Sequence, residues 1–218
     1  MSSAATKIGL RERKKLRTKQ AIVDVASRLF LEQGYQETTL VQIAEEAEVA
    51  PSTFFNYFPT KVDLVFCFFD AIIESAKVRI AGRPAGEAAL DAIVAWLRED
   101  LLEVEGPYVH AIGRMPAVIA SDPELGAGER LRSALLEDVL AEAFARDLGE
   151  PADGVRSRVL AALAYRGMQE VWAAWYAKHA NDSEMHLEDV FEAKAVYVTE
   201  LLSTALGFVD HLPPVPVD

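Results

Sequence analysis

The chain has 218 residues, of which 51% are hydrophobic, and a formal net charge of −12. This length fits one compact domain or a small domain on a larger one, with apolar side chains left over for a subunit interface. The single cysteine, Cys67, excludes an intrachain disulfide and is predicted to be a small buried side chain. No apolar run is long enough for a membrane span and the N-terminus is too polar for a signal peptide, so we predict a cytoplasmic protein without membrane contact.

The charge is divided unevenly along the chain. Residues 1–63 contain nine Lys or Arg and eight acids, whereas residues 64–218 contain thirteen and twenty-six. A protein that is acidic throughout would bind nucleic acid poorly, but basic residues gathered at one end permit binding there. The acidic part is not expected to wrap a nucleic acid.

The N-terminal segment, residues 1–19, is a basic arm. The first twenty residues contain seven Lys or Arg and one acid. Clustered cationic side chains can contact the phosphate backbone or the minor groove of DNA, and we predict this for Lys15, Arg17 and Lys19. A solvated tail is the alternative, and it is the favoured interpretation for Lys7 and Arg11.

A first helix follows the arm. Its apolar stripe has helical spacing and consists of Ile22, Val25, Ala26, Leu29 and Phe30. Gly34 is a natural end for this helix.

Residues 38–61 predict two short helices joined by a tight turn. Thr39 and Gln42 have the spacing of a capping box that starts a helix at Leu40. Residues 48–50 form the turn, and Pro51 suits the first position of the second helix. The apolar positions of the first of these helices are Leu40, Ile43, Ala44 and Ala47.

This layout is typical of a helix-turn-helix DNA reader, whose second helix enters the major groove. Short polar side chains can approach bases and phosphates closely, and Asn can read adenine with two hydrogen bonds. An ordinary helical hairpin in an all-α core is the alternative, and the capping role of Gln42 competes with a DNA role. The predicted DNA-binding residues of this segment are Thr38, Thr39, Gln42, Pro51, Ser52, Thr53, Asn56, Tyr57 and Lys61.

The order of residue types resembles the TetR family of transcriptional regulators. The family pattern is roughly Thr-Leu/Val-x-x-Ile-Ala-x-x-Ala-Gly-Val-Ser-x-x-Thr-Leu-Tyr-x-Tyr/His-Phe-x-x-Lys-x-x-Leu. Matching residues are Thr39, Leu40, Ile43, Ala44, Ala47, Val49, Thr53, Tyr57, Phe58, Lys61 and Leu64, preceded by Ala21, Ile22, Ala26, Leu29, Phe30, Gly34 and Tyr35. The resemblance covers roughly the first sixty-five residues.

Three positions depart from the family pattern. Glu48 replaces the turn Gly, which costs about 1 kcal/mol if that site needs φ > 0. Ala50 replaces the Ser that caps the second helix, a loss of about 1 kcal/mol. Phe55 replaces a Tyr whose hydroxyl often reaches a phosphate in the family, so this contact is not expected here.

The rest of the chain predicts long helices and shows no alternating strand pattern, so the fold class is all-α. Gly and Pro separate predicted helices over 61–80, 87–104, 108–120, 123–147, 153–180 and 186–206. The helix over 123–147 is either continuous or interrupted at Gly126–Gly128. The predicted domains are the arm (1–19), a three-helix DNA-binding head (20–64), a larger helical body for effector binding and dimerisation (65–208), and a proline-rich tail (209–218).

The resemblance implies a body that forms a homodimer through its last two helices and holds a small-molecule effector. A self-contained core is the alternative for these helices. Effector pockets are mostly apolar with a few polar groups, although core packing is the commoner role for any single residue. The candidates are Phe66, Phe69, Trp96, Tyr108, His110, Arg114, Met115, Met168, Trp172 and Trp175.

No catalytic, cofactor-binding or metal-binding motif is present in the sequence, so we predict no cofactor, no metal and no enzymatic activity. We predict a TetR-like regulator, a repressor that binds a palindromic operator as a dimer and is released by an apolar or amphipathic effector. The alternatives are an all-α enzyme or ligand-binding scaffold with a vestigial head, or an activator that lacks an effector.

Overall fold

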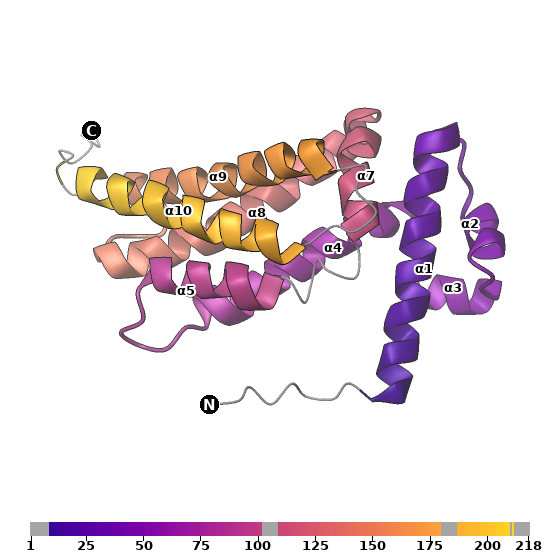
Figure 1. Cartoon of the computed structure of the whole chain (residues 1–218), viewed down its shortest axis with the longest axis horizontal. Coiled ribbons are helices and arrows are strands. Elements are labelled where there is room, and N and C mark those ends of the chain that lie inside the picture. Colours follow the sequence, from indigo (N-terminus) through magenta and orange to yellow (C-terminus); the bar gives the residue numbers. More distant parts are fainter. Residues whose placement is uncertain (1–8, 102–108, 180–186, 210, 212–218) are drawn as a thin grey trace. The chain divides into compact units, whose positions relative to one another are not determined.

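The computed structural model describes residues 9–101, 109–179, 187–209 and 211, and in these ranges the chain forms helices and no strands (Figure 1). The all-α prediction is confirmed. The helices are α1 (Leu10–Gln33), α2 (Leu40–Glu46), α3 (Pro51–Tyr57), α4 (Lys61–Ala76), η1 (Lys77–Ala81), α5 (Ala89–Ala95), η2 (Trp96–Asp100), α7 (Val109–Ala120), α8 (Pro123–Leu148), α9 (Val155–His179) and α10 (Leu187–Val209). The π-helical turns η1 and η2 continue α4 and α5, and α8 runs through Gly126–Gly128 without a break.

The chain divides into two compact units. The head unit contains the residues up to Cys67 together with His110–Gly126, and the body unit contains Phe68–Val109 and the residues from Ala127 onward. The head unit is therefore discontinuous in sequence. A single boundary near residue 64 does not describe it, because α7 and the first turn of α8 belong with the N-terminal helices.

The first helix begins at Leu10 rather than near residue 20. Arg, Lys and Leu are strong helix formers, so the basic segment continues the helical pattern of the residues after it. The helix ends at Gly34, whose φ is 95° and whose N–H donates to Phe30 O at 3.1 Å. The sequence prediction for this end is confirmed. The whole of the predicted arm from Leu10 onward is thus the N-terminal part of α1.

The core of the head unit consists of apolar side chains from each of its first helices. Those with no more than 3% of their surface exposed include Ile22, Val23, Ala26, Phe30, Ile43, Ala44, Phe54 and Phe58. Phe30 and Tyr35 make an edge contact with ring centroids 5.1 Å apart, which extends the core to the turn after α1. The two short helices are held mainly by this shared core, since helices of seven residues are unstable alone.

Two polar contacts join α7 and α8 to the N-terminal helices. Arg114 Nη1 donates to Ser27 Oγ of α1 at 3.3 Å, and Gln36 Nε2 donates to Asp122 Oδ2 at 2.6 Å. Asp122 also caps α8, because its Oδ1 accepts from Glu124 N at 2.8 Å and from Leu125 N at 3.2 Å. The hydrogen bond from Gln36, followed by those from the α8 backbone, holds the pKa of Asp122 below its ordinary value.

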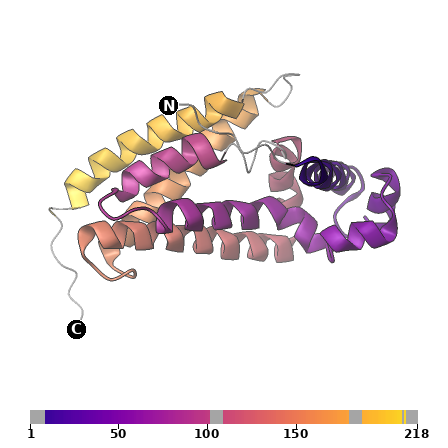
Figure 2. The ribbon, with the colours of Figure 1, turned by 90° about the horizontal axis from the view of Figure 1, so that it is seen from below.

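In the body unit, α4 and α8 run side by side (Figure 2). Arg132 of α8 pairs with Asp70 of α4 at 2.9 Å, and further along Arg146 donates to Ala81 O at 2.7 Å. The next helix, α9, runs antiparallel to α8, and Ser133 Oγ of α8 lies 2.6 Å from Tyr165 Oη of α9.

The last two helices pack closely along their lengths (Figure 1). Gly167 of α9 makes this approach possible, because a Cβ there would lie 3.2 Å from Leu201 Cδ2 and 3.4 Å from the Tyr197 ring. Nearer the end of α9, the Lys194 ammonium lies 4.7 Å from the Trp172 ring centroid and 4.8 Å from that of Phe191.

A buried arginine joins three segments of the body unit. Arg83 is 8% exposed and donates to Glu87 O at 2.9 Å and to Ala143 O at 2.8 Å. It also pairs with Asp147 at 2.5 Å, and Asp147 in turn accepts from Ala89 N at 2.5 Å. The end of η1, the start of α5 and the end of α8 therefore share one hydrogen-bonded centre.

Candidate nucleic-acid interface

The start of α2 carries the predicted capping box. Thr39 Oγ1 accepts from Gln42 N at 3.2 Å, and Gln42 Oε1 accepts from Thr39 N at 2.9 Å. Because a backbone N–H can only donate, the side-chain oxygen of Gln42 must face Thr39. The amide nitrogen of Gln42 takes no part in the box. Capping and DNA contact, which compete in the sequence interpretation, are therefore compatible for this residue.

Thr38 occupies a different environment from its neighbour Thr39. Its side chain is 1% exposed, and its hydroxyl donates to Gly34 O at 2.8 Å while Gln33 Nε2 donates to it at 3.2 Å. The hydroxyl of Thr38 is thus both a donor and an acceptor within the turn after α1. The geometry does not support the predicted DNA contact for Thr38, whereas Thr39 is exposed.

The turn between α2 and α3 closes on a left-handed residue. Val49 N donates to Ala44 O at 2.9 Å, which is the 6→1 bond of a Schellman motif, and Glu48 has φ 54°. Glu48 thus adopts the backbone conformation for which the family pattern has Gly. A second departure also has the expected result, since Ala50 gives α3 no side-chain cap and Pro51 begins the helix.

Five of the twelve predicted DNA-binding residues lie on α3. Pro51, Ser52, Thr53 and Asn56 are exposed, and Tyr57 is half-buried beside Phe58 with ring centroids 6.5 Å apart. The opposite side of the helix holds the buried Phe54 and Phe58. The helix therefore combines an anchored apolar side with small polar side chains that can reach base edges.

The basic residues of α1 do not share one face. Lys19 is half-buried, and its ammonium lies 5.9 Å from the Phe58 ring centroid, so this side of α1 faces the end of α3. Lys15 lies four residues earlier and shares that side, as does Arg11 one turn further, and both are exposed. Arg17 is exposed on nearly the opposite side. Helical spacing, rather than the total charge of the arm, identifies Arg11 as a companion of Lys15.

The Lys61 ammonium donates hydrogen bonds to backbone carbonyls within the head unit. Its Nζ donates to Tyr35 O at 2.8 Å and to Gln36 O at 3.1 Å, and it lies 4.6 Å from the Tyr35 ring centroid. These contacts tie the start of α4 to the turn after α1. The arrangement favours a structural role over the predicted phosphate contact, because the ammonium would have to leave these acceptors to reach DNA.

The predicted effector residues fall into both structural units. Phe66 and Met115 are fully buried in the head unit, and Arg114 bonds to Ser27 there. His110 lies in α7, and Tyr108 lies outside the described residues. The structure does not bring the ten candidates together within one unit.

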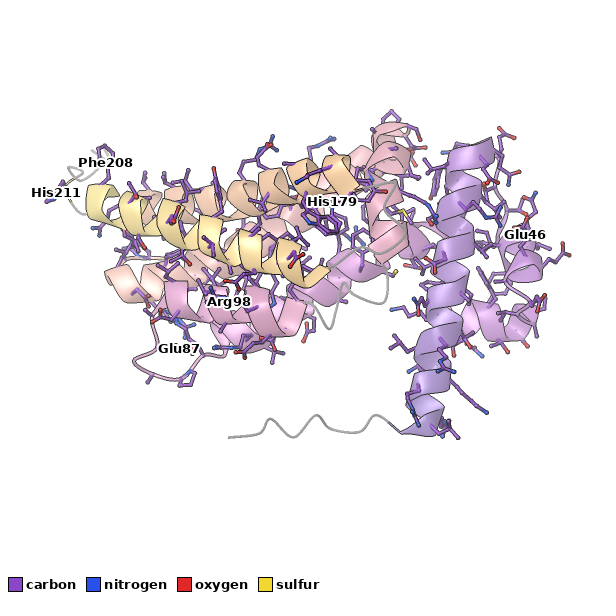
Figure 3. All side chains as sticks on the ribbon, in the orientation of Figure 1. Glu46, Glu87, Arg98, His179, Phe208 and His211 are labelled. Atoms are coloured by element: carbon purple, nitrogen blue, oxygen red, sulfur yellow. The ribbon has the colours of Figure 1, made fainter. Side chains whose placement is uncertain are left out.

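In the body unit, the candidates differ in exposure. Trp96 is 1% exposed and its indole N–H donates to Ser75 Oγ at 3.0 Å, which is the arrangement of a core residue. Met168 is buried and Phe69 is half-buried. Trp172 and Trp175 are half-buried and stacked, with ring centroids 5.7 Å apart, and His179 continues the stack at 4.8 Å from Trp175 (Figure 3).

The part of the chain that the structure describes contains neither a group of metal ligands nor a membrane-spanning helix. No group of three or more possible ligands is arranged to hold a metal ion in this part of the chain. Among the described helices, none is long and apolar enough to cross a membrane.

A three-helix head with a capped α2, a Schellman turn and an exposed polar surface on α3 defines a helix-turn-helix DNA-binding protein. The sequence pattern of the bacterial regulatory proteins, tetR family, matches residues 22–66. The HTH-type transcriptional regulator TcmR of Streptomyces glaucescens is 35% identical over 185 residues, which are 81% of this chain and 80% of TcmR. The chain belongs to the TetR family of transcriptional regulators, so it is a DNA-binding regulator and not an enzyme.

One further sequence relative and one solved structure are also similar to this chain. The biofilm operon icaADBC HTH-type negative transcriptional regulator IcaR of Staphylococcus aureus strain Newman is 27% identical over 114 residues, or 50% of this chain and 58% of IcaR. Among solved structures, the SmeT–triclosan complex superposes with a TM-score of 0.58 at 16% identity, covering 92% of this chain and 99% of SmeT. The structural match supports the fold.

Proposed function

We propose that this chain is a homodimeric transcriptional repressor that binds a palindromic operator through α3 and is released by a small-molecule effector. The observation that carries the DNA part is the exposed polar surface of α3, opposite the buried Phe54 and Phe58. The proposed contacts come from Thr39, Gln42, Pro51, Ser52, Thr53, Asn56 and Tyr57, with Lys15 and Arg11 on α1 at the phosphates.

Dimerisation follows from the requirement to read two half-sites. One α3 covers few base pairs, so a two-fold pair of heads matches a palindrome. Exposed apolar side chains on α9 and α10 support these helices as the interface, because each unpaired one leaves apolar surface in water. They are Val155, Val159, Val196, Tyr197 and Phe208, exposed by 42–66%, with Phe208 on the last turns of α10 (Figure 3).

Selection from random duplexes tests the DNA part of this proposal. We expect enrichment of an inverted repeat and affinity that falls steeply with salt. Enrichment of no sequence would contradict a regulator that reads an operator.

Sedimentation of two matched variants tests the interface. Val159→Glu places a charge on the proposed contact surface of α9, and we expect a monomer with greatly weakened operator binding. Val78→Glu is the control, since Val78 is 69% exposed on η1 and lies outside the proposed interface. Sedimentation of Val159→Glu as a dimer would place the interface elsewhere.

For the effector, we propose that Trp172 and Trp175 respond to binding and Trp96 does not. The first two are half-buried, whereas the Trp96 indole is enclosed and bonded to Ser75. Planar apolar compounds, with triclosan as the first probe because SmeT binds it, can be screened by fluorescence. We expect a compound that releases operator DNA to quench the wild type and to quench Trp172→Phe/Trp175→Phe much less.

A further inference from the structure

A phenylalanine side chain is exposed on the helix that reads DNA. Phe55 of α3 is 46% exposed, although the adjacent Phe54 is fully buried and Phe58 is 1% exposed. An exposed phenyl ring leaves apolar surface in water, and none of its atoms can form a hydrogen bond with a phosphate or a base. The ring therefore adds nothing to a polar DNA contact, and contact with an apolar group would remove its exposed surface from water.

The position of Phe55 places the ring beside the proposed reading surface. The Phe55 ring makes an edge contact with the buried Phe54 ring, with centroids 5.5 Å apart and planes at 87°. One edge of the Phe55 ring therefore packs against the core. Ser52 lies one turn earlier on the same side of the helix, and Asn56 is the next residue. When these two side chains approach base edges, the outer edge of the Phe55 ring enters the same groove.

We propose that Phe55 determines operator specificity by packing against the C5-methyl group of a thymine in each half-site. The thymine methyl is the apolar feature of the major-groove edge of the bases, and phenylalanine is one of the side chains that contact it. This inference rests on the proposed use of α3 as the reading helix. It assigns a sequence-reading role to a position whose family counterpart is a tyrosine directed at a phosphate.

Uracil substitution in the selected operator tests the proposal, because uracil removes the methyl group and keeps every hydrogen bond of thymine. Each thymine is replaced in both half-sites at once, and the affinity of the full-length protein is measured. At one symmetric position we expect a loss of about fourfold per half-site, the equivalent of one buried methyl group. At the other thymines we expect changes below twofold.

Phe55→Ala completes the test as a double-variant cycle. We expect it to bind the thymine operator about as weakly as the wild type binds the uracil operator, and to bind both operators equally. The matched control is Val78→Ala, which truncates an exposed apolar side chain in the body unit. It should keep the wild-type preference for thymine. Thermal melting checks that both variants fold, and Phe55→Leu provides a second, larger apolar side chain that should keep part of the preference.

Three results would overturn the proposal. A wild-type protein that binds thymine and uracil operators equally at every position makes no methyl contact. If Phe55→Ala weakened binding to both operators by the same factor, the variant would keep the wild-type preference for thymine. The ring would then lie against the sugar-phosphate backbone. A protein that selects no operator at all would remove the proposed function as well, which distinguishes that failure from the first two.

Discussion

Two pairs of helices, α2–α3 in the head unit and α9–α10 in the body unit, show different ways of fixing a helix in place. The first pair has seven residues in each helix and combines a shared apolar core with bonds at the helix ends: the capping box at Thr39 and the Schellman turn at Glu48. The second pair has helices of 25 and 23 residues that pack along their length and approach closely at Gly167. The short pair exposes polar side chains, which we propose contact DNA, whereas the long pair exposes apolar side chains, which we propose contact a second subunit.

The use of basic residues also separates the two units. On α1, Lys15 and Arg11 are exposed on the side that faces the end of α3. In the body unit, Arg83 is buried and bonded to a carboxylate and to backbone carbonyls. We propose that a basic residue in the first setting contributes to DNA affinity, whereas one in the second setting contributes to the stability of the fold.

The largest expected effect is on the stability of the body unit. Arg83→Met removes a buried cation, leaves Asp147 without its counterion and removes a donor from the carbonyls of Glu87 and Ala143, so we expect a loss of about 3 kcal/mol in the free energy of unfolding. Arg98→Met is the control, because Arg98 pairs with Glu192 on an exposed surface at 2.7 Å and should cost less than about 1 kcal/mol (Figure 3). Urea unfolding followed by circular dichroism measures both. Equal losses would contradict the special role of Arg83.

The next effect separates base reading from phosphate binding within the head unit. For Asn56→Ala we expect operator binding to weaken roughly 10- to 100-fold and the base preference to relax at one position of each half-site. For Lys15→Ala we expect weaker binding to all duplexes and a salt slope reduced by about one per subunit. Affinities measured over a salt series on operator and unrelated duplexes distinguish the two. A loss of sequence preference in Lys15→Ala would contradict its assignment to phosphates.

Lys61→Ala tests the structural role of that lysine. We expect a loss of about 1.5 kcal/mol in stability, since charged hydrogen bonds to two carbonyls disappear, and no change in the salt slope of operator binding. Lys15→Ala is the comparison, with the opposite pattern of effects. A reduced salt slope with unchanged stability would restore Lys61 to the phosphate contacts.

A smaller effect of opposite sign is expected at the turn. Glu48→Gly relieves a left-handed backbone conformation and should stabilise the head by about 1 kcal/mol. Glu45→Gly, three residues earlier on the exposed side of α2, should destabilise it by about the same amount, because glycine is a poor helix former. Thermal melts show whether the two glycines act in opposite directions. Two losses would mean that the Glu48 side chain contributes more than its strain costs.

The smallest effect concerns pH. The lowered pKa of Asp122 means that its carboxylate contributes stability above its ordinary pKa of about 4, and that this contribution is lost as the pH falls through the lower folded-state value. Asp122→Asn keeps an oxygen for the α8 cap and cannot titrate. We expect the difference in Tm between wild type and variant to shrink as the pH is lowered from about 5 to about 3, and a constant difference would contradict the linkage.

The sequence predicted the features that depend on local chemistry. The capping box at Thr39, the end of α1 at Gly34 and the start of α3 at Pro51 each follow from residues adjacent in the chain. The left-handed conformation of Glu48 follows from the same kind of information, because the family pattern has glycine at that position.

The features that sequence reasoning missed depend on residues far apart in the chain. The inclusion of α7 in the head unit rests on contacts such as Arg114 with Ser27 and Asp122 with Gln36. The sequence predicts a DNA contact for Lys61 because it does not show that the carbonyls of Tyr35 and Gln36 lie within hydrogen-bonding distance of the ammonium. Thr38 and Thr39 cannot be distinguished by residue type, since the direction of the chain at the turn decides which hydroxyl is buried.

The two π-helical turns have a consequence for the length of the chain. A π turn holds one residue more than the α turn that it replaces, and η1 and η2 each lie at the C-terminal end of a regular helix. Deleting a single residue within η1, where Val78 is 69% exposed, would convert it to an α turn and leave the register of α4 from Lys61 to Ala76 unchanged. Related chains can therefore differ by one residue at these turns and keep the same fold, whereas the same deletion in mid-α4 would rotate every later side chain by about 100°.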